Sequence, residues 1–426
     1  MGALAGLPAA DARAQAAPCP SPTCVTQETS ALEWKGELRE RVLQYRPARF
    51  GIASGDDDYA IARGLSSLEW RGARLRAFAQ LGAHAERGRK GGPARTDQGA
   101  LDAQQAWLGW QDDDWSGWLG RQEIAYGSSR LISRRDGPNI RLAFEGLRAS
   151  RQTQRMRIDA FVLRPVENRA GSFDDRADPG QGLWGVYASR AAGAHATGLD
   201  AYLLGYRRDG ARFAGASGDE TRRSLGLRAF GHRGRWDWNL EGVYQWGRIR
   251  SSTSRVQDIS AWTVASDSGY TFDDTRGSPR ISMKIDLASG DGDASDRRLQ
   301  TFNALYPRAS YFSEASLIAP ANLFDAQPAL TMKPRAGLEI TTGWNFVWKH
   351  RRADAVYTTP TPLTVVPGTA GTSRRVGDQF KLEARQALAQ GWELQLHLAH
   401  FRAGPALREA GGGDVDFASV TLGWQW

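Results

Sequence analysis

Apolar and polar residues alternate with a period of two from about Leu32 to the end of the chain. In RWDWNLEGVYQWG, Trp236 and Trp238 have one parity, and Asp237 and Asn239 have the other. The segments RISMKIDL, LEITTGWNFVW and WELQLHLAHF repeat this scheme. Because successive side chains of a β-strand point to opposite faces, the pattern predicts an all-β protein. We count about 14 clear strands, or about 16–18 when their boundaries are drawn generously.

The chemistry of the two faces distinguishes a membrane barrel from a soluble sheet. One face carries closely interleaved charges of both signs, whereas the apolar face has Trp or Tyr at its ends. A soluble sandwich hides its apolar face, but aromatic residues at strand ends are typical of membrane interfaces. We therefore predict a single transmembrane antiparallel β-barrel over residues 32–426, in a bacterial outer membrane. The predicted membrane-facing aromatic girdle consists of Trp236, Trp246, Trp344, Trp348, Trp424 and Trp426.

The hydropathy of the chain favours strands over helices as the spanning elements. Mean hydropathy is -0.50, and no stretch approaches the roughly 20 apolar residues that a membrane helix requires. This excludes a helical membrane protein. It does not exclude a barrel, because lumen and lipid residues alternate there and their hydropathies average out.

The two ends of the chain fit the same architecture. The terminal segment DVDFASVTLGWQW alternates up to Trp426, as expected of a last strand that pairs with the first and is read by the barrel assembly machinery. Residues 1–31 contain the cleavage pattern AQA at 14–16 and are expected to be a signal-peptide remnant and flexible periplasmic leader. A disordered leader without a signal is the alternative. Cys19 and Cys24 lie in this leader and would form a small disulfide or stay free.

Charge and motifs narrow the expected partners. The net charge is +8, but the arginines are spread singly along strands, with no basic run flanked by stacking aromatics. We therefore expect no nucleic-acid partner. The chain has no G-x-S-x-G or H-E-x-x-H motif, and His397 and His400 have opposite strand parity, so we expect no enzyme. The expected surroundings are outer-membrane lipid and lipopolysaccharide around a monomer.

Three segments resemble the alginate-export family of outer-membrane porins. They are WLGRQEIAYGSSRLISRRDGPNIRLAFEGLR at 118–148, GLWGVYAS at 182–189 and TFNALYPRASYFSEASLIAPANLFDAQPAL at 301–330. The resemblance spans residues 33–426. It implies a single barrel of about 18 strands with a charged, Arg-rich lumen, and a channel for export or diffusion of alginate-like uronates.

The polar faces supply candidate lumen residues, among which basic and acidic groups nearly balance. Arg binds carboxylates through its planar fork, so the expected solutes are anionic saccharides or small carboxylates. The alternative for each charge is an ion-pair lattice that keeps the lumen hydrated and rigid. Within the resembling block, Arg121 and Glu123 alternate on one face, as do Arg141 and Glu145. The predicted pathway residues are Arg39, Arg121, Glu123, Arg141, Glu145, Arg157, Arg280, Lys284 and Arg385.

The longest segment without periodicity covers about residues 289–333. We expect an outer loop that folds over or into the barrel as a gate, because such long loops are commonly functional. If the loop plugs the lumen permanently, the chain would be a non-conducting structural or adhesion barrel, which is the alternative function. No cofactor is expected, although Asp291, Asp293 and Asp296 have a spacing that suits a Ca²⁺ ion.

Overall fold

The computed structural model describes residues 31–192, 197–308, 310–359 and 363–426. The predicted leader at residues 1–31, with its two cysteines, lies outside the described residues except for Ala31, which begins the first strand.

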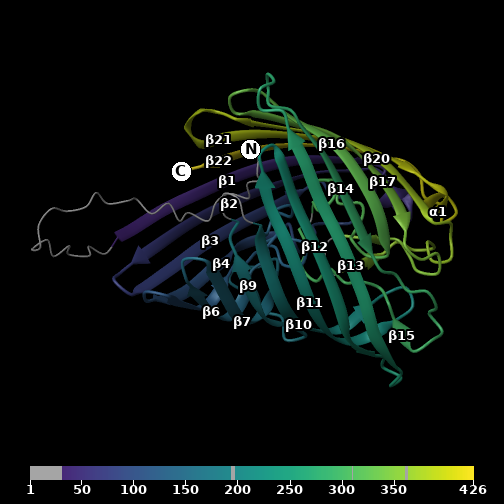
Figure 1. The fold of residues 1–426 in the computed structure, drawn as a ribbon, viewed down its shortest axis with the longest axis horizontal. Coiled ribbons are helices and arrows are strands. Elements are labelled where there is room, and N and C mark those ends of the chain that lie inside the picture. Colours follow the sequence, from purple (N-terminus) through teal and green to yellow (C-terminus); the bar gives the residue numbers. More distant parts are fainter. Residues whose placement is uncertain (1–30, 193–196, 309, 360–362) are drawn as a thin grey trace, which may run out of the picture.

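Eighteen antiparallel strands of the described chain form one closed barrel wall, which confirms the number that the resemblance implies and is the upper end of the range that the alternation gives (Figure 1). Outward side chains along these strands are mostly apolar and exposed, whereas inward side chains are buried and include both charged groups and apolar residues such as Leu163, Leu183 and Leu204. In order around the barrel, the wall strands are β1 (Ala31–Arg46), β2 (Asp57–Arg71), β3 (Leu75–Arg87), β4 (Gly99–Gln111), β5 (Trp115–Gln122), β6 (Phe144–Gln152), β7 (Met156–Glu167), β9 (Gln181–Arg190), β10 (Gly198–Arg212), β11 (Ser217–Arg233), β12 (Trp236–Arg250), β13 (Val256–Thr271), β14 (Arg280–Ala288), β16 (Leu323–Arg335), β17 (Leu338–Lys349), β20 (Arg375–Ala387), β21 (Trp392–Ala403) and β22 (Val415–Gln425).

Short elements lie in the connections between wall strands. No helix of the described chain is long and apolar enough to cross a membrane. The short elements are the strands β8 (Arg176–Ala177), β15 (Arg298–Leu299), β18 (Tyr357–Thr358) and β19 (Thr364–Val365), the 3-10 helices η1 (Ala48–Gly51) and η2 (Ala389–Gly391), and the helix α1 (Pro405–Arg408).

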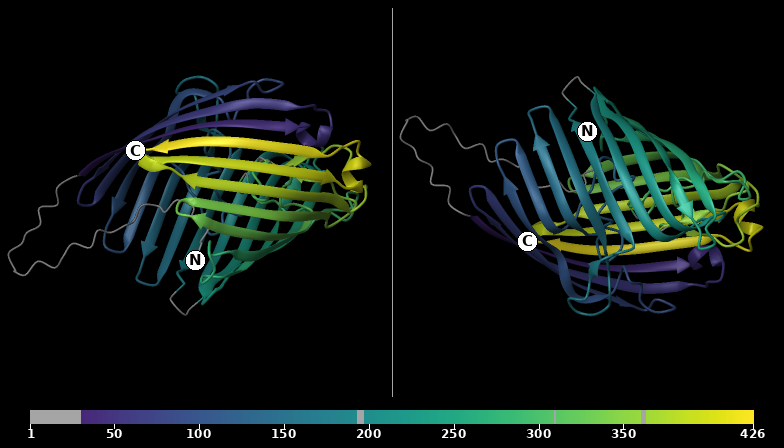
Figure 2. Two further views of the ribbon diagram at one scale, coloured as in Figure 1. Left: turned by 90° about the horizontal axis from the view of Figure 1, so that it is seen from above. Right: turned by 90° about the horizontal axis from the view of Figure 1, so that it is seen from below.

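β1 and β22 close the barrel by pairing with each other. In Figure 2, purple β1 lies beside yellow β22. Their register runs from Glu37 opposite Gln425 to Arg46 opposite Asp416. The other wall strands pair with their neighbours in chain order. A closed wall leaves no sheet edge with unpaired backbone groups in lipid, where each would cost several kcal/mol.

Burial shows which face of the wall meets lipid. On the outward face, Leu108, Val162 and Leu227 are 67%, 68% and 65% exposed. On the inward face, Arg222 and Asp159 are each 1% exposed. This arrangement is the reverse of a soluble sheet and is that of a barrel in a membrane.

The predicted girdle tryptophans have the outward parity of their strands. Trp236 begins β12, while Trp424 and Trp426 end the chain, so all three lie at the same rim, with Trp236 on a distant strand. There, Trp424 packs on Trp392 and Trp426 with ring centroids 5.6 Å and 4.5 Å apart. The other three lie farther along their strands: Trp246, Trp344 and Trp348. Their contact with the membrane interfaces stays a prediction.

The two rims of the barrel differ in their connections. At the rim where β22 ends, turns such as 72–74 and 336–337 join neighbouring strands. At the opposite rim, residues 123–143 and 289–322 form long connections. We call these rims the short-turn rim and the long-loop rim, which face the periplasm and the exterior in outer-membrane barrels. We call residues 123–143 the first inward loop and residues 289–322 the second inward loop.

Candidate functional site

Two neighbouring strands stop short and open the wall toward the interior. β5 and β6 have 8 and 9 residues, whereas β1 has 16. Gly120 of β5 and Gly146 of β6 lie opposite each other in the sheet register, and their φ angles are +126° and +148°. A Cβ on these glycines would lie 2.3 Å from the Ala106 oxygen and 2.2 Å from the Val162 oxygen, so both positions require glycine. Beyond this glycine pair, the chain leaves the wall as the first inward loop.

Residues 171–177 take the place in the wall that β5 and β6 leave. The Ala100 backbone N–H donates to the Gly171 oxygen, and the Phe173 N–H donates to the Leu101 oxygen. At the other side of the gap, β8 pairs with the end of β7. The wall therefore continues from β4 to β7 at the long-loop rim while the first inward loop turns inward.

Arg121 holds this junction together. Its guanidinium donates to the Glu145 carboxylate at 2.7 Å, to the Asp102 carboxylate at 3.1 Å and to the Asp175 carbonyl oxygen at 2.9 Å. Arg121 and Glu145 are thus partners across β5 and β6. Because their bonds join β4, β6 and residues 171–177, they serve the wall junction.

The first inward loop is bound to β1 through its main-chain oxygens. Arg39 donates to the carbonyl oxygens of Asp136 at 2.6 Å and Pro138 at 2.9 Å. Arg41 donates to the carbonyl oxygen of Gly137 at 3.1 Å. The Asp136 carboxylate lies 3.9 Å from Arg39. Two inward arginines of β1 therefore bind mainly neutral oxygens of the loop.

Beneath this loop lies a dense cluster of arginines and acids. Arg63 donates to Glu37 and, at 3.0 Å, to Asp136. Arg141 donates to Glu123 at 2.9 Å and to Glu37 at 3.3 Å. Asp136 lies inside the barrel, and the surrounding protein by itself would raise its pKa even though the side chain is half exposed; the nearby guanidinium groups, first that of Arg63, hold the pKa well below its usual range. The Asp136 side chain is 51% exposed, against 2% for Arg63, so Asp136 is the group most open to lumen water.

The second inward loop crosses the lumen to the opposite wall. Arg222 on β11 donates to the carbonyl oxygen of Thr301 at 3.2 Å. Farther along the loop, Glu314 accepts a bond from Arg41 on β1 at 2.6 Å. Eight wall strands separate β1 from β11 in either direction around the barrel. The segment between these contacts therefore spans the diameter of the barrel.

The two inward loops pack against each other inside the barrel. The Tyr306 backbone N–H donates to the Leu131 oxygen at 2.8 Å, and the Tyr306 ring packs edge-on against Phe144 at 5.2 Å. Phe302, Tyr306 and Phe312 are 2%, 2% and 4% exposed. The loops therefore form one packed constriction.

Charged groups tie this constriction to the rest of the wall. Arg130 of the first inward loop donates to Glu241 on β12 at 3.1 Å and to the Tyr311 hydroxyl at 2.8 Å, and it lies 3.7 Å from Asp286 on β14. Contacts to β1, β11, β12 and β14 thus fix the loops on opposite sides of the barrel.

Three wall cations hold one short stretch of the second inward loop. Lys284 on β14 and Lys381 on β20 donate to the carbonyl oxygens of residues 311–312 at 2.9 Å and 2.8 Å. Arg41 holds Glu314 in the same stretch. Lys284 belongs to the predicted pathway set, and Arg41 and Lys381 have the inward parity of their strands in the sequence, whereas Glu314 was not predicted. Glu314 lies in a segment without periodicity, so no sequence signal singles it out.

The structure corrects the predicted pairing within the resembling block. We predicted that Arg121 with Glu123, and Arg141 with Glu145, share a strand face. Glu123 and Arg141 instead lie outside β5 and β6, in the first inward loop. The bonded pairs are Arg121 with Glu145 and Arg141 with Glu123. The alternation continues past the strand ends, so it could not reveal where the wall stops.

The remaining predicted pathway residues lie away from the constriction. Arg157, Arg280 and Arg385 each donate to a wall carboxylate, at 2.9 Å, 2.8 Å and 2.5 Å. They occupy inward positions near the short-turn rim. Arg39, Lys284, Glu123 and Arg141 are the predicted residues that contact or belong to the inward loops.

The predicted long loop and its acidic residues differ in detail from the expectation. β16 begins at Leu323, so residues 323–333 belong to a strand. Asp293 accepts from the Ser295 backbone N–H, and Asp296 accepts from that of Arg298. Asp291, Asp293 and Asp296 are not among the described acids whose carboxylates converge.

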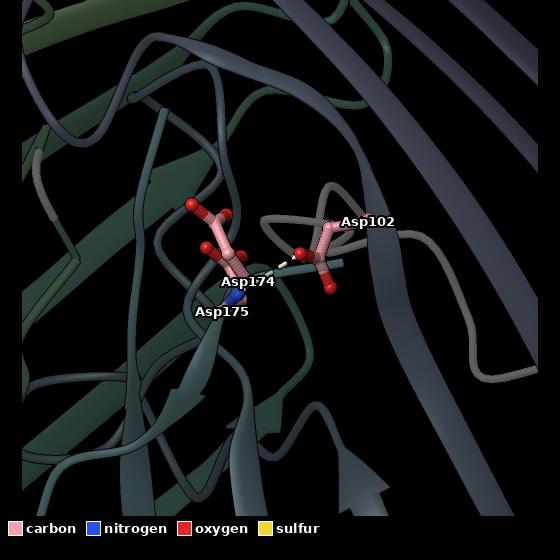
Figure 3. Close-up of side chains that lie close together, drawn as sticks. All are labelled: Asp102, Asp174 and Asp175. Carbon is pink, nitrogen blue, oxygen red and sulfur yellow. Dashed lines mark hydrogen bonds between the residues drawn. The ribbon is translucent and has the colours of Figure 1, made fainter. Parts of the chain in front are cut away.

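Three acidic residues of the described chain do bring their carboxylates together. Oxygens of Asp102, Asp174 and Asp175 lie within 4.8 Å of one another, and Figure 3 shows Asp174 and Asp175 side by side, facing Asp102. The Asp175 backbone N–H donates to Asp102 at 3.0 Å, and Arg121 also binds Asp102. Burial, together with the Asp102 charge, raises the pKa of Asp175 to about 6. These internal bonds fit a role in closing the wall with residues 171–177.

Comparison with known protein families identifies the family of this chain. A family model described as "Alginate export" matches residues 31–421. The chain belongs to the alginate export family. This family consists of outer-membrane channels, and the barrel of this member lies in the outer membrane. No curated protein sequence matches the chain.

Solved structures similar to this alginate export family member are outer-membrane proteins of the same fold. Acinetobacter baumannii OccAB1 has a TM-score of 0.62 at 12% identity, covering 93% of this chain and 96% of its own. A BenF-like porin from Pseudomonas fluorescens has a TM-score of 0.62 at 10% identity, with coverages of 93% and 98%. Pseudomonas aeruginosa OpdK with vanillate has a TM-score of 0.59 at 11% identity, with coverages of 92% and 98%. At these identities, the likeness concerns the fold alone.

Proposed function

We propose that this protein is a diffusion channel for anionic saccharides, such as alginate-like uronates, or for small carboxylates. The observation that carries the proposal is that cations at the constriction bind neutral main-chain oxygens. Arg39 binds two carbonyl oxygens and Lys381 binds one, with carboxylates at 3.9 Å and 3.7 Å. Such cations attract a passing anion and still release it, because water and carbonyl oxygens compete for them.

Two comparisons support the chemical class of the solute. Membership of the alginate export family favours a uronate. OpdK, which shares the fold alone with this chain, was crystallised with vanillate, so a barrel of this fold can hold a carboxylate. Both observations fit a constriction in which Arg can bind a carboxylate with its planar fork.

A non-conducting structural or adhesion barrel is the second candidate. The observation that favours it is the packing of the second inward loop across the lumen, where Phe302 and Tyr306 are each 2% exposed. This candidate requires that the loop stay in place under all conditions. A channel requires that solute pass the loop or move it.

Single-channel current in a planar bilayer separates the two candidates. The refolded protein is placed in a salt gradient, and oligouronate is then added. We expect discrete current steps, a reversal potential that favours anions, and block by oligouronate. Steps without anion preference or block would reject the carboxylate solute. The absence of steps from folded protein would favour the structural barrel.

A further inference from the structure

The stretch 311–314 of the second inward loop occupies a basic site on the inner wall. Lys284 donates to the carbonyl oxygen of Tyr311 at 2.9 Å. Lys381 donates to the carbonyl oxygen of Phe312 at 2.8 Å. These lysines come from β14 and β20, which are separated in the wall by β16 and β17, and both side chains bind the same short piece of the loop. The loop therefore presents oxygen atoms where a solute would meet the cations.

The third contact of this stretch is an ion pair. Glu314 lies 2.6 Å from Arg41, and the two side chains are 20% and 5% exposed. Burial by itself would raise the pKa of Glu314, but the charges of Arg41 and then His397 lower it to about 2. Glu314 is therefore ionised at neutral pH. Among the described residues, Glu314 is the carboxylate paired with Arg41, so the loop rather than the wall supplies this partner.

We propose that residues 311–314 are an internal ligand of the solute site, and that a uronate displaces Glu314 from Arg41 as it passes. This inference rests on the proposed function. The stretch offers one carboxylate and two neutral oxygens to three cations. A uronic acid offers the same set, because its carboxylate lies beside ring and hydroxyl oxygens. The site therefore suits a uronate better than a neutral sugar or a simple alkyl carboxylate.

At each cation, the solute would replace a loop oxygen of the same charge: a neutral oxygen at each lysine and a carboxylate at Arg41. Lys284 and Lys381 bind neutral oxygens, which sugar hydroxyls or water can replace at small net cost. Arg41 is 5% exposed, and leaving it without an anion would be costly, so the arriving carboxylate must take the place of Glu314. Opening of the loop and binding of the solute are therefore coupled.

The first test compares the variant Glu314→Gln with wild type in planar bilayers, with D-glucuronate as the probe and glucose as the neutral control. Removing the competing charge should lower the glucuronate concentration that halves the current by about tenfold, the effect of losing one charge-assisted bond. Resting conductance should also rise. The matched control is Glu339→Gln, because Glu339 pairs with Lys333 near the short-turn rim and lies away from the inward loops.

A second readout follows the loop itself. Ala315 is 3% exposed and adjoins Glu314. In a chain with Cys19→Ser and Cys24→Ser, the thiol introduced by Ala315→Cys should react slowly with a water-soluble maleimide. Glu314→Gln should accelerate the reaction severalfold, as should glucuronate.

The outcomes distinguish this inference from the proposed function. If glucuronate blocks wild type but Glu314→Gln changes neither the half-blocking concentration nor the labelling rate, the internal-ligand inference is wrong, whereas the proposed channel function is still supported. If glucuronate does not block wild type, the uronate channel is wrong, and the labelling rate still decides whether Glu314 holds the loop. Equal effects of Glu314→Gln and Glu339→Gln would also overturn the inference.

Discussion

Asp291 is a buried carboxylate at the start of the second inward loop, and its charge is poorly compensated. It is 3% exposed, and neither carboxylate oxygen has a hydrogen bond of normal geometry among the described residues. Burial, followed by the charges of Asp354 and Asp296, raises its pKa to about 6. The backbone N–H groups of Asp293 and Gln300 offset only part of this rise. Asp291 should therefore destabilise the fold when it is ionised.

The variant Asp291→Asn tests this expectation through its pH dependence. The folded pKa of about 6 exceeds the unfolded value of 3.8, so the stability linked to this group is complete below 3.8 and is lost as pH rises through 6. At pH 7.5, Asp291→Asn should raise the free energy of unfolding by about 1–3 kcal/mol, and at pH 3.5 by much less. The measurement is the urea midpoint of the refolded barrel at both pH values. Asp293→Asn is the control, because Ser295 binds the Asp293 carboxylate. A gain that is equal at both pH values would contradict the expectation.

Residue types were predictable here, but their partners were not. Alternation alone places Arg121, Glu145, Arg141 and Glu123 among the inward or loop charges. Which acid binds which arginine depends on strand register and on where β5 and β6 end. Arg121 and its partner Glu145 are 24 residues apart in the chain. A period-two pattern carries no information about such a separation.

Strands were the best-predicted elements, and the inward loops were the least. Most wall strands show the same alternation, because lipid on one face and the lumen on the other constrain alternate residues. The inward loops lack this constraint, since they contact protein on several sides. The second inward loop was expected to fold over or into the barrel, and its contacts with β11 and β1 place it across the lumen. The ends of the first inward loop were not predicted, because Glu123 and Arg141 continue the strand pattern.

The pairing of Gly120 with Gly146 between β5 and β6 can be tested by substitution. Gly146 has a φ of +148°, and a Cβ there would lie 2.2 Å from the Val162 oxygen. Gly146→Ala should therefore cost about 1–3 kcal/mol of folding free energy through backbone strain, and more if the clash persists. The temperature at which the folded band disappears from unboiled gels should fall. Gly242→Ala is the matched control, because a Cβ on Gly242 would meet nothing within 4 Å. If the folded bands of the two variants disappear at the same temperature, position 146 does not require glycine.

The whole molecule has two unlike halves. The inward loops enter from the long-loop rim and are bound to the wall about midway along the strands, at Arg39, Arg41 and Glu241. Toward the short-turn rim, inward charges pair with each other along the wall, as Arg280 does with Asp237. The described loop contacts therefore stop part-way down the barrel. We therefore expect the lumen to be constricted from the long-loop rim to about mid-barrel and to be wider on the short-turn side.

This asymmetry predicts unequal access for polymers from the two sides of a bilayer. Polyethylene glycol that enters a pore displaces ions and lowers its conductance, whereas polymer too large to enter does not. Polymers added on the short-turn side should lower the conductance up to a larger molecular mass than polymers added on the long-loop side. The orientation of each channel can be assigned with a membrane-impermeant thiol reagent and the variant Gly413→Cys, because Gly413 lies in the connection between β21 and β22 at the long-loop rim. The same mass cut-off from both sides would contradict this asymmetry. A larger cut-off from the long-loop side would mean that the inward loops leave the lumen when the channel conducts.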